Sequence, residues 1–218
     1  MKVSIIGCGA WGITLAELLN RNQHNVLVWC HSESIVTSIN EHHKVQNLDD
    51  KPLSPSIVAT NKLEEVCLFS DIVVIALASS FVSLIAEHVN HFQDNTKFLV
   101  LTKGFIPGAS SELLLVPDFI SSLFEKRPTI QTAVLSGPNL AGEIDRKLPA
   151  ATVIASENMQ TASFFQELLT NESFRVYTST DVVGVSLGGI LKNIMAIAAG
   201  VIDGLELGFN AKSAFLTR

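Results

Sequence analysis

Lys192 lies in the middle of the most apolar stretch of the chain, residues 182–202. Its neighbours in the sequence are large apolar residues: Ile190, Leu191, Ile194 and Met195. An ammonium group buried among them is costly unless it has an anionic partner or a proton to transfer. Lysine in an apolar setting is also a usable acid or base, because burial disfavours its charged form. We therefore expect Lys192 to be catalytic; the alternative is a lysine whose stem packs in the core while its ammonium reaches water.

A second candidate for chemistry is the glycine-rich segment near the N-terminus. Gly7, Gly9 and Gly12 have the spacing G-x-G-x-x-G between an expected strand, 2–6, and an expected helix. Such glycines permit a tight turn, let the backbone approach a pyrophosphate, and place that anion at the positive end of the helix. Because another strand pattern follows at 25–29, the segment predicts dinucleotide binding. A glycine-rich turn in some other α/β protein is the alternative.

A third candidate is the end of a later strand, at 102–104, where Lys103 is followed by a glycine. Ligands of open α/β sheets bind at the carboxyl ends of the strands. Lys103 would therefore lie beside a cofactor or substrate, with room left by Gly104. An exposed lysine in a turn is the alternative. The Ser-Gly-Pro-Asn segment at 136–139 also follows a strand, but on its own it indicates only a turn.

The elements that must position these residues alternate along the first 180 residues. The expected strands are 2–6, 25–29, 56–60, 71–77, 97–102, 131–136, 151–155 and 174–178, the last at a sheet edge. Helical patterns cover 81–89, 110–124 and 159–169, and residues 40–55 have the composition of a surface loop. Strands alternating with helices predict a Rossmann-type, doubly wound and mainly parallel α/β sheet.

The pattern changes at about Thr180, after which no strand is expected. Residues 181–202 and 210–218 both have helical patterns. We expect a dinucleotide-binding domain over 1–180, followed by the start of an all-α domain over 181–218. Because the sequence stops at Arg218 inside an expected helix, we also expect it to be the front part of a longer protein.

The composition is that of a globular protein with a substantial core, at 47% hydrophobic and 17% charged residues. A net charge of −6 without a basic cluster argues against nucleic acid as a partner. The cysteines, Cys8, Cys30 and Cys67, are an odd number without metal-ligand spacing, so we expect neither a disulfide framework nor a metal site. A reducing, cytoplasmic location is the default expectation.

Residues 182–202 are long enough to cross a bilayer, so a membrane span has to be considered. Two polar residues, Lys192 and Asn193, stand side by side at its centre, and no Lys or Arg flanks it closely. Both features are unusual for a membrane helix. We therefore expect no membrane span, and a helix that is apolar all round fits the centre of a two-domain enzyme.

Together these segments resemble the NAD(P)-dependent glycerol-3-phosphate dehydrogenases of the bacterial type. The resemblance runs through the glycine loop, 102–104, 136–143 and 187–200, and it continues into 203–218. The segments 136–143 and 187–200 are specific in combination. The resemblance implies reversible hydride transfer between NAD or NADP and dihydroxyacetone phosphate, which gives sn-glycerol 3-phosphate for glycerophospholipid synthesis.

The resemblance also implies roles for individual residues. Lys192 is similar to the family's proton donor and acceptor, and Lys103 to a lysine shared by cofactor and substrate. The positions that match cofactor contacts are Gly7, Gly9, Ala10, Trp11, Gly12, His31, Lys103 and Ala141. Gly137 and Asn139 match substrate contacts, although Asn139 stands where a hydroxyl residue is usual. That departure keeps a polar side chain and puts its contact in doubt.

Two further expectations concern the cofactor and the rest of the family's site. Residues 28–32, at the end of the second strand, contain no Asp or Glu that could bond a ribose 2′-hydroxyl. We therefore expect NADP(H) to be accepted at least as well as NAD(H), with His31 near the adenosine phosphate. The family also carries an aspartate that assists the lysine and an Arg-Asn pair for the substrate phosphate, beyond the part matched here.

Other assignments stay open at this point. A different dehydrogenase with a Rossmann domain and a helical domain, such as a ketopantoate reductase, has the same overall pattern. A non-catalytic or shortened NAD(P)-binding module is the alternative from another class. The sequence does not decide between NAD and NADP, and it leaves open whether the protein forms a homodimer.

Overall fold

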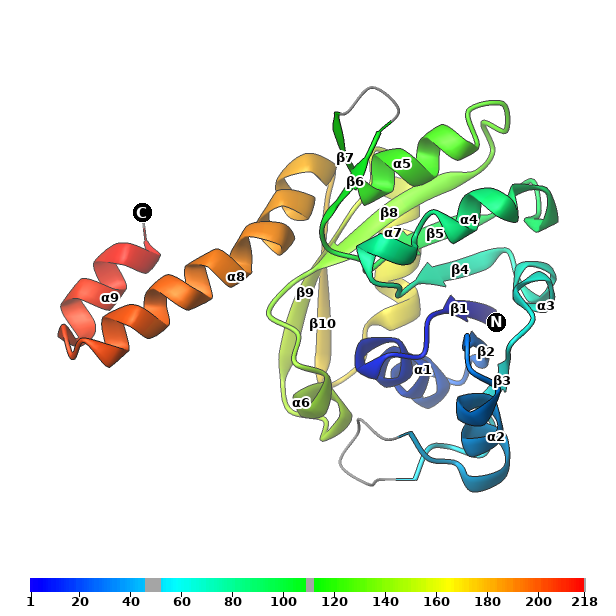
Figure 1. The fold of residues 1–218 in the computed structure, drawn as a ribbon, viewed down its shortest axis with the longest axis horizontal. Helices are drawn as coiled ribbons and strands as arrows, with labels where there is room; N and C mark the ends of the chain where they lie inside the picture. The colour runs from blue at the N-terminus through cyan, green and yellow to red at the C-terminus, as the bar shows by residue number, and fades with distance from the viewer. Residues whose placement is uncertain (46–51, 109–111, 218) are drawn as a thin grey trace.

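The computed structural model describes residues 1–45, 52–108 and 112–217, which form a layered α/β unit from which two C-terminal helices project (Figure 1). The central sheet has the order β10-β9-β8-β5-β4-β1-β2-β3. Its strands are β1 (Lys2–Ile6), β2 (Asn25–Trp29), β3 (Val58–Thr60), β4 (Ile72–Ile75), β5 (Lys97–Val100), β8 (Gln131–Ser136), β9 (Ala150–Ala155) and β10 (Phe174–Ser179). The expected doubly wound, mainly parallel sheet is confirmed.

Helices cover both faces of this sheet. They are α1 (Ala10–Arg21), α2 (Glu33–His42), α3 (Leu63–Phe69), α4 (Leu84–Glu87), α5 (Val116–Leu123), α6 (Ala141–Asp145) and α7 (Met159–Leu169). The side chains of a strand point alternately to the two faces. In β4, for example, Val74 belongs to the core shared with α1 and α7, whereas Val73 and Ile75 belong to the core shared with α3 and α5. The near-continuous apolar strands are therefore explained by burial on both faces.

The strand order reverses between β1 and β4. From β1 the chain proceeds outward to β2 and β3, and β4 then pairs with the other side of β1. This reversal opens a crevice at the carboxyl ends of β1 and β4, which is where open α/β sheets bind ligands. One pair departs from parallel: β9 runs antiparallel to β8, with Leu135 opposite Ile154.

Two helical expectations were wrong in part. Residues 81–89 form a broken series instead of one helix, with η1 (Ser79–Phe81), α4 and η2 (Val89–His91) in succession. The pattern at 110–124 combines a strand and a helix: β6 (Phe105–Pro107) pairs with β7 (Leu113–Leu115), and α5 begins only at Val116. A proline in the first turn of α5 fits a helix start, since its missing N–H has no intrahelical partner there. Residues 109–111 of that expectation lie outside the described residues.

The expected loop over 40–55 is shorter than its composition indicated. Helix α2 continues to His42 and ends at His43, whose φ of 53° is in the left-handed region. Leu53 is buried, and its backbone N–H donates to the carbonyl of His43 at 2.7 Å. Residues 46–51 of this expectation lie outside the described residues.

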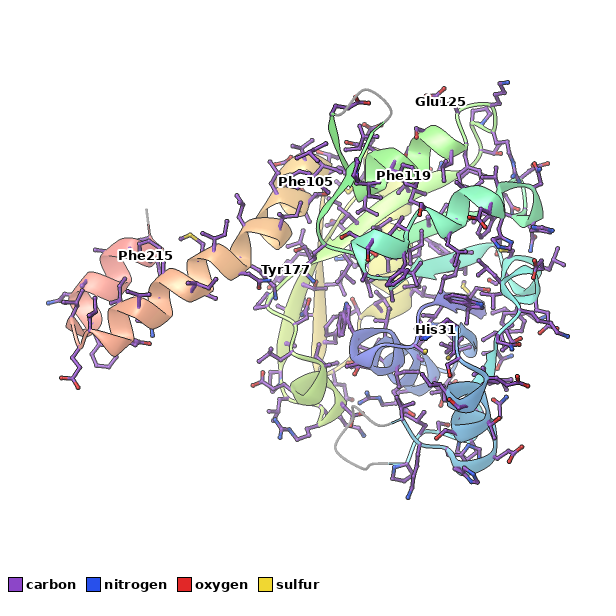
Figure 2. The ribbon with its side chains drawn as sticks, viewed as in Figure 1. His31, Phe105, Phe119, Glu125, Tyr177 and Phe215 are labelled. Carbon is purple, nitrogen blue, oxygen red and sulfur yellow. The ribbon has the colours of Figure 1, made fainter. Side chains whose placement is uncertain are left out.

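Helix α8 (Val182–Gly204) begins against the sheet and then leaves it (Figures 1 and 2). Asp181 caps its N-terminus by accepting a bond from the backbone N–H of Gly184 at 2.7 Å. Beyond the sheet, α9 (Gly208–Leu216) folds back beside α8. Lys212 on α9 pairs with Asp203 on α8 at 2.6 Å.

The expected burial of Lys192 was wrong for this chain. Lys192 is exposed, as are three of the apolar neighbours expected around it: Leu191, Ile194 and Met195. The reason is that only the first turns of α8 pack on the sheet, where Ser186 and Gly189 are buried. By length and hydropathy α8 could cross a membrane, which is weak evidence because core helices of soluble proteins meet the same criterion.

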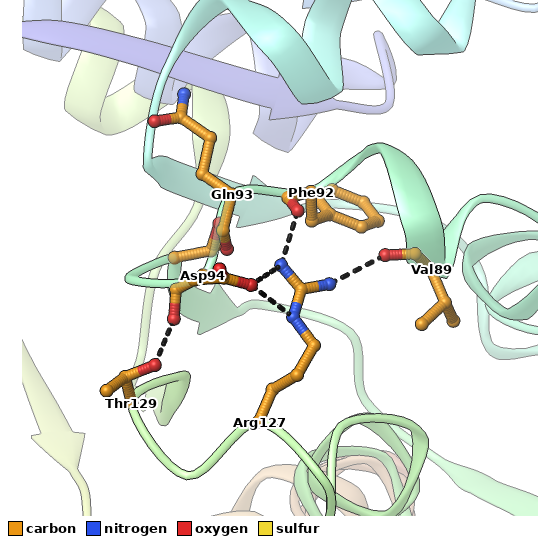
Figure 3. Close-up of polar contacts among 7 residues, drawn as sticks. Val89, Phe92, Gln93, Asp94, Arg127 and Thr129 are labelled. Atoms are coloured by element: carbon orange, nitrogen blue, oxygen red, sulfur yellow. Dashed lines mark hydrogen bonds and ion pairs between the residues drawn. The ribbon is translucent and has the colours of Figure 1, made fainter.

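Arg127 lies just before β8 and holds the segment that leads into β5, at the amino ends of these strands and away from the crevice (Figure 3). Its guanidinium donates to the backbone carbonyls of Val89 and Phe92 and also pairs with Asp94 at 2.9 Å. The Asp94 side chain is 91% exposed, whereas that of Arg127 is only 22% exposed. Exposed ion pairs contribute little, so the carbonyl bonds are the stronger part of this contact.

We predict that Arg127→Met lowers the free energy of unfolding by about 1.5–3 kcal/mol, because two carbonyls lose a charged donor. Asp94→Asn, in contrast, should leave stability nearly unchanged. Urea denaturation of both variants tests this, with Lys126→Met as a control for removing a neighbouring exposed charge. Equal destabilisation by Arg127→Met and Asp94→Asn would show that the ion pair, and not the carbonyl contact, holds this segment.

Candidate functional site

The glycine loop lies at the crevice between β1 and β4. Gly7 has φ of +121°, and a Cβ at this position would lie 2.5 Å from the carbonyl oxygen of Ala76. Two independent constraints therefore exclude a side chain at Gly7, one conformational and one of space. Ala76 is itself fixed, because its N–H donates to the carbonyl of Ile6 at 2.8 Å.

The other two glycines of the loop differ in what a side chain at their position would meet. A Cβ on Gly12 would lie 2.2 Å from the carbonyl oxygen of Gly7, so this glycine lets α1 pack closely on the turn. A Cβ on Gly9 would meet nothing within 4 Å. The protein itself therefore does not require a glycine at position 9, and the free space there is what a closely approaching ligand would fill.

The N-terminus of α1 is suited to an anion. Gly9 caps the helix without a side-chain hydrogen bond, and no acidic residue lies in the first turn. The first N–H groups, including those of Ala10 and Trp11, thus have no intrahelical partner and carry the positive end of the helix dipole. A pyrophosphate fits this position, so the residues present are compatible with the expected dinucleotide.

The remaining residues expected to contact the cofactor surround this helix start. His31 is exposed directly after β2 (Figure 2), and Ala141 begins α6, which packs against α1. The Cys8 and Cys30 thiols are hydrogen-bonded to each other, and this bond holds the pKa of Cys8 below its usual value. Sequence reasoning did not predict this contact; parallel pairing of β1 with β2 brings the two cysteines together.

Lys103 is held above the carboxyl ends of β4 and β5. The Thr102 hydroxyl donates to the carbonyl of Leu77 at 2.8 Å, which ties the two strand ends together. Gly104 follows with φ of +128°, and a Cβ there would lie 3.0 Å from Ser79 Oγ. Burial lowers the pKa of Lys103, and the positive charge of Lys192 lowers it further.

Gly137 and Asn139 lie at the end of β8 beside β9. A Cβ on Gly137 would lie 2.9 Å from both Asn139 Oδ1 and Thr152 Oγ1, so no side chain fits. The Asn139 side-chain amide donates to the carbonyl of Ala151 at 3.1 Å. Its amide nitrogen is therefore engaged in the fold, which leaves the carbonyl oxygen Oδ1 as its freer polar atom.

A cleft of about 370 Å³ separates the end of β8 from α8, and Lys192 and Gly137 both line it. The α8 residues in this cleft are Gly184, Val185, Gly188 and Lys192, whose spacing places them on one side of the helix. Ser186, Gly189 and Ile190 follow on the adjacent side and line a smaller cavity that contains Lys103. The first turns of α8 thus bring together two lysines that are 89 positions apart in the sequence.

The structure sorts the expected site residues into two groups. One surrounds the start of α1: Gly7, Gly9, Ala10, Trp11, Gly12, His31 and Ala141. The other lies where α8 meets the strand ends: Lys103, Gly137, Asn139 and Lys192. Two ammonium groups near each other favour an anionic ligand, since each raises the cost of charge on the other. Sequence reasoning missed Ser186, which lies with Gly189 on the side of α8 that faces the sheet.

A wider groove of about 470 Å³ lies at the other end of β8 and contains none of these residues. Three carboxylates line it: Asp118, Glu125 and Glu157. Its Arg127 guanidinium already bonds to protein carbonyls. This groove therefore offers neither the glycine loop nor free positive charge for a phosphorylated ligand.

Comparison with known proteins gives a consistent result over the whole chain. Residues 2–162 match the family model for the N-terminus of NAD-dependent glycerol-3-phosphate dehydrogenase, and residues 181–218 match the model for its C-terminus. Two relatives called glycerol-3-phosphate dehydrogenase [NAD(P)+] are 36% identical, from Macrococcus caseolyticus, and 38% identical, from Fusobacterium nucleatum. Each alignment covers 100% of this chain but only 65% and 64% of the respective relative.

A solved structure of glycerol-3-phosphate dehydrogenase from Coxiella burnetii superimposes with a TM-score of 0.84 at 31% identity. The superposition covers 99% of this chain and 65% of the Coxiella burnetii chain. The enzyme from Saccharomyces cerevisiae gives a TM-score of 0.85 at 27% identity. The chain therefore spans about two thirds of the length of these relatives.

We predict that Gly9→Ala weakens NADPH binding by about tenfold or more while leaving the melting temperature unchanged, because its Cβ enters only the space left for the ligand. Gly12→Ala should instead destabilise the fold by about 1–3 kcal/mol, since its Cβ meets the Gly7 carbonyl. Calorimetric titration and thermal unfolding separate the two effects. Gly200→Ala, on the exposed part of α8, is the control and should change neither NADPH affinity nor the fold. Unaltered NADPH affinity in folded Gly9→Ala would be the contrary result.

Proposed function

Because this chain belongs to the family of NAD-dependent glycerol-3-phosphate dehydrogenases, we propose that it carries the cofactor site and part of the catalytic site of such an enzyme. The reaction is hydride transfer between NAD(P)H and dihydroxyacetone phosphate to give sn-glycerol 3-phosphate, for glycerophospholipid synthesis in the cytoplasm. The observation that carries the proposal is the placement of Lys103 and Lys192 in two neighbouring cavities at the first turns of α8, where burial and the charge of Lys192 both lower the pKa of Lys103. We also propose that residues 1–180 form the dinucleotide-binding domain and that residues 181–218 begin a helical domain.

The cofactor would be held by the backbone at the start of α1. Its pyrophosphate fits the N–H groups after Gly9, and its adenosine end fits the side of His31 and the end of β2. When bound, a nicotinamide supplies or accepts the hydride. Ala141 and Trp11, both half-buried, form apolar surface beside this helix start.

Lys192 would act on the substrate carbonyl. Negative charge grows on that oxygen during reduction, and a positioned ammonium stabilises the charge and then transfers its proton to the oxygen. In the reverse direction the neutral amine takes the proton from the hydroxyl. Lys103, across the same region, would attract the phosphates of substrate and cofactor as a compact point charge. Gly137 leaves its backbone open to the substrate at the end of β8.

The exposed half of α8 bears on how complete this site is. Catalysis of this kind requires that water be excluded from the reacting atoms, and Lys192 is exposed in the 218 residues. Large apolar side chains are also exposed along the same two helices, among them Ile194, Ile197, Val201 and Phe209. We infer that further protein, corresponding to the third of the relatives not matched here, covers these helices and closes the site.

Two other functions have less support. A non-catalytic nucleotide-binding module would need the glycine loop but not the second lysine at the cleft. A ketopantoate reductase would share the sheet and the helix, yet the relatives matched over the entire chain bear the other name. That the protein forms a homodimer stays a prediction.

We predict that Lys192→Met in the full-length protein lowers kcat by about two to four orders of magnitude, the range typical of a positioned proton-transfer group. NADPH affinity and melting temperature should stay nearly the same, because Lys192 belongs to no contact of the sheet core and a linear apolar side chain suits this helix. The matched control is Lys212→Met on α9. A folded Lys192→Met enzyme with near-normal kcat would remove Lys192 from the mechanism.

Cofactor choice gives a separate prediction. Without a carboxylate at the end of β2, the site should bind NADPH at least as tightly as NADH. His31→Asp should reverse this preference, because a carboxylate accepts the ribose 2′-hydroxyl and repels a 2′-phosphate. Competition binding with both nucleotides measures the ratio. Strong preference of the unmodified protein for NADH would show that His31 does not lie near the adenosine phosphate.

A further inference from the structure

Ser186 is a buried hydroxyl without a partner in the described part of the chain. Its residue is 7% exposed, and its Oγ is fully buried without a hydrogen bond to any described group. A serine inside a helix can usually bond to the carbonyl of the preceding turn, but this one does not. Leaving a buried hydroxyl unsatisfied costs about 1–3 kcal/mol, so such a group requires an explanation.

The hydroxyl lies at a small cavity between α8 and the strand ends. The cavity measures about 10 Å³ and is lined by both Ser186 and Lys103, together with Ser136 and Gly189. A Cβ on Gly189 would lie 2.6 Å from Ser136 Oγ and 3.7 Å from Lys103 Cε, so α8 is packed closely at this point. The volume is about that needed for one water molecule, and the lining supplies the two or more polar partners that a buried water requires.

Lys103 is the other half of this arrangement. Its ammonium has three N–H donors, and no described residue accepts a hydrogen bond from it. It is the one titratable group among the residues that line the cavity. Lys192 on α8 is the charged group that acts on Lys103, and its positive charge repels the Lys103 ammonium. On α5, Asp118 faces the neighbouring groove, where its charge interacts with Glu157.

We propose that Ser186 is a positioning residue for Lys103. Its Oγ and the Oγ of Ser136 hold a single water molecule, and this water accepts one N–H of the Lys103 ammonium. Lys103 is thereby held at a fixed angle over the strand ends, with its other N–H groups directed to the ligand side.

The arrangement changes the balance between the two forms of Lys103. Water bonded to the ammonium stabilises the charged form, which opposes burial and the repulsion from Lys192. Removing the Ser186 hydroxyl weakens that stabilisation, so the pKa of Lys103 should fall and its neutral amine should appear at lower pH. The effect on catalysis rests on the proposed function, but the titration of Lys103 does not.

The test is competitive acetylation of the 218-residue chain across the alkaline range, with the modification of Lys103 followed by mass spectrometry. We expect Ser186→Ala to shift the midpoint of Lys103 acetylation down by about one pH unit. Ser186→Thr keeps a hydroxyl and should stay close to the unmodified chain. Ser163→Ala, a serine-to-alanine change on α7 outside this cavity, should have no effect.

An unchanged Lys103 profile in Ser186→Ala would overturn the inference, and so would equal shifts in Ser186→Ala and Ser186→Thr. If Ser186→Ala does not fold, a high-resolution crystal structure of the unmodified chain decides, because the water must lie within hydrogen-bond distance of Ser186 Oγ and Lys103 Nζ. A dry cavity would overturn it. Lack of turnover with dihydroxyacetone phosphate, in contrast, counts against the proposed function and leaves the acetylation result standing.

Discussion

The close contact between α8 and the end of β8 at Gly189 is the constraint on which the candidate site depends. A Cβ at this position would lie 2.6 Å from Ser136 Oγ, so any side chain here would force the Ser136 hydroxyl or the helix to move. The close contact places Lys192 over the cleft beside Gly137 and brings Ser186 to the cavity beside Lys103. If the helix were displaced outward, the two lysines would lie in separate surroundings.

The crevice between β1 and β4 supplies the other fixed point. Gly7 and Gly12 are required by the protein itself, because a side chain at either would strike backbone atoms. Gly9 is not, and it stands at the start of α1 where an anion is favoured. Both fixed points lie at carboxyl ends of strands, so a dinucleotide bound at α1 can extend along the sheet edge toward the two ammonium groups. An anionic substrate would then relieve the repulsion between Lys103 and Lys192.

Much of the fold was predictable because its local signals agree with the tertiary structure. The strands at 2–6, 25–29 and 131–136 were expected with the bounds observed, since they are apolar runs flanked by turn residues. The hairpin of β6 and β7 was not expected, because three leucines at 113–115 fit a helix as well as a strand. The antiparallel β9 was not predictable either, since pairing direction depends on the path of the connection and not on strand composition.

For the site, the sequence showed which polar residues have apolar neighbours along the chain, but not which groups surround them in the fold. The exposure of Lys192 could not be predicted from its apolar neighbours, because burial depends on what packs against α8. Likewise, Ser186 has no recognisable motif, and its significance follows only from its missing hydrogen bond.

The central claim is that one ligand joins the glycine loop to the two lysines, and a crystal structure of the chain with NADPH bound tests it most directly. The account predicts the pyrophosphate at the N–H groups after Gly9 and the nicotinamide ring between Lys103 and Lys192. NADPH bound in the groove beside α5, or with its nicotinamide directed away from both lysines, would contradict it.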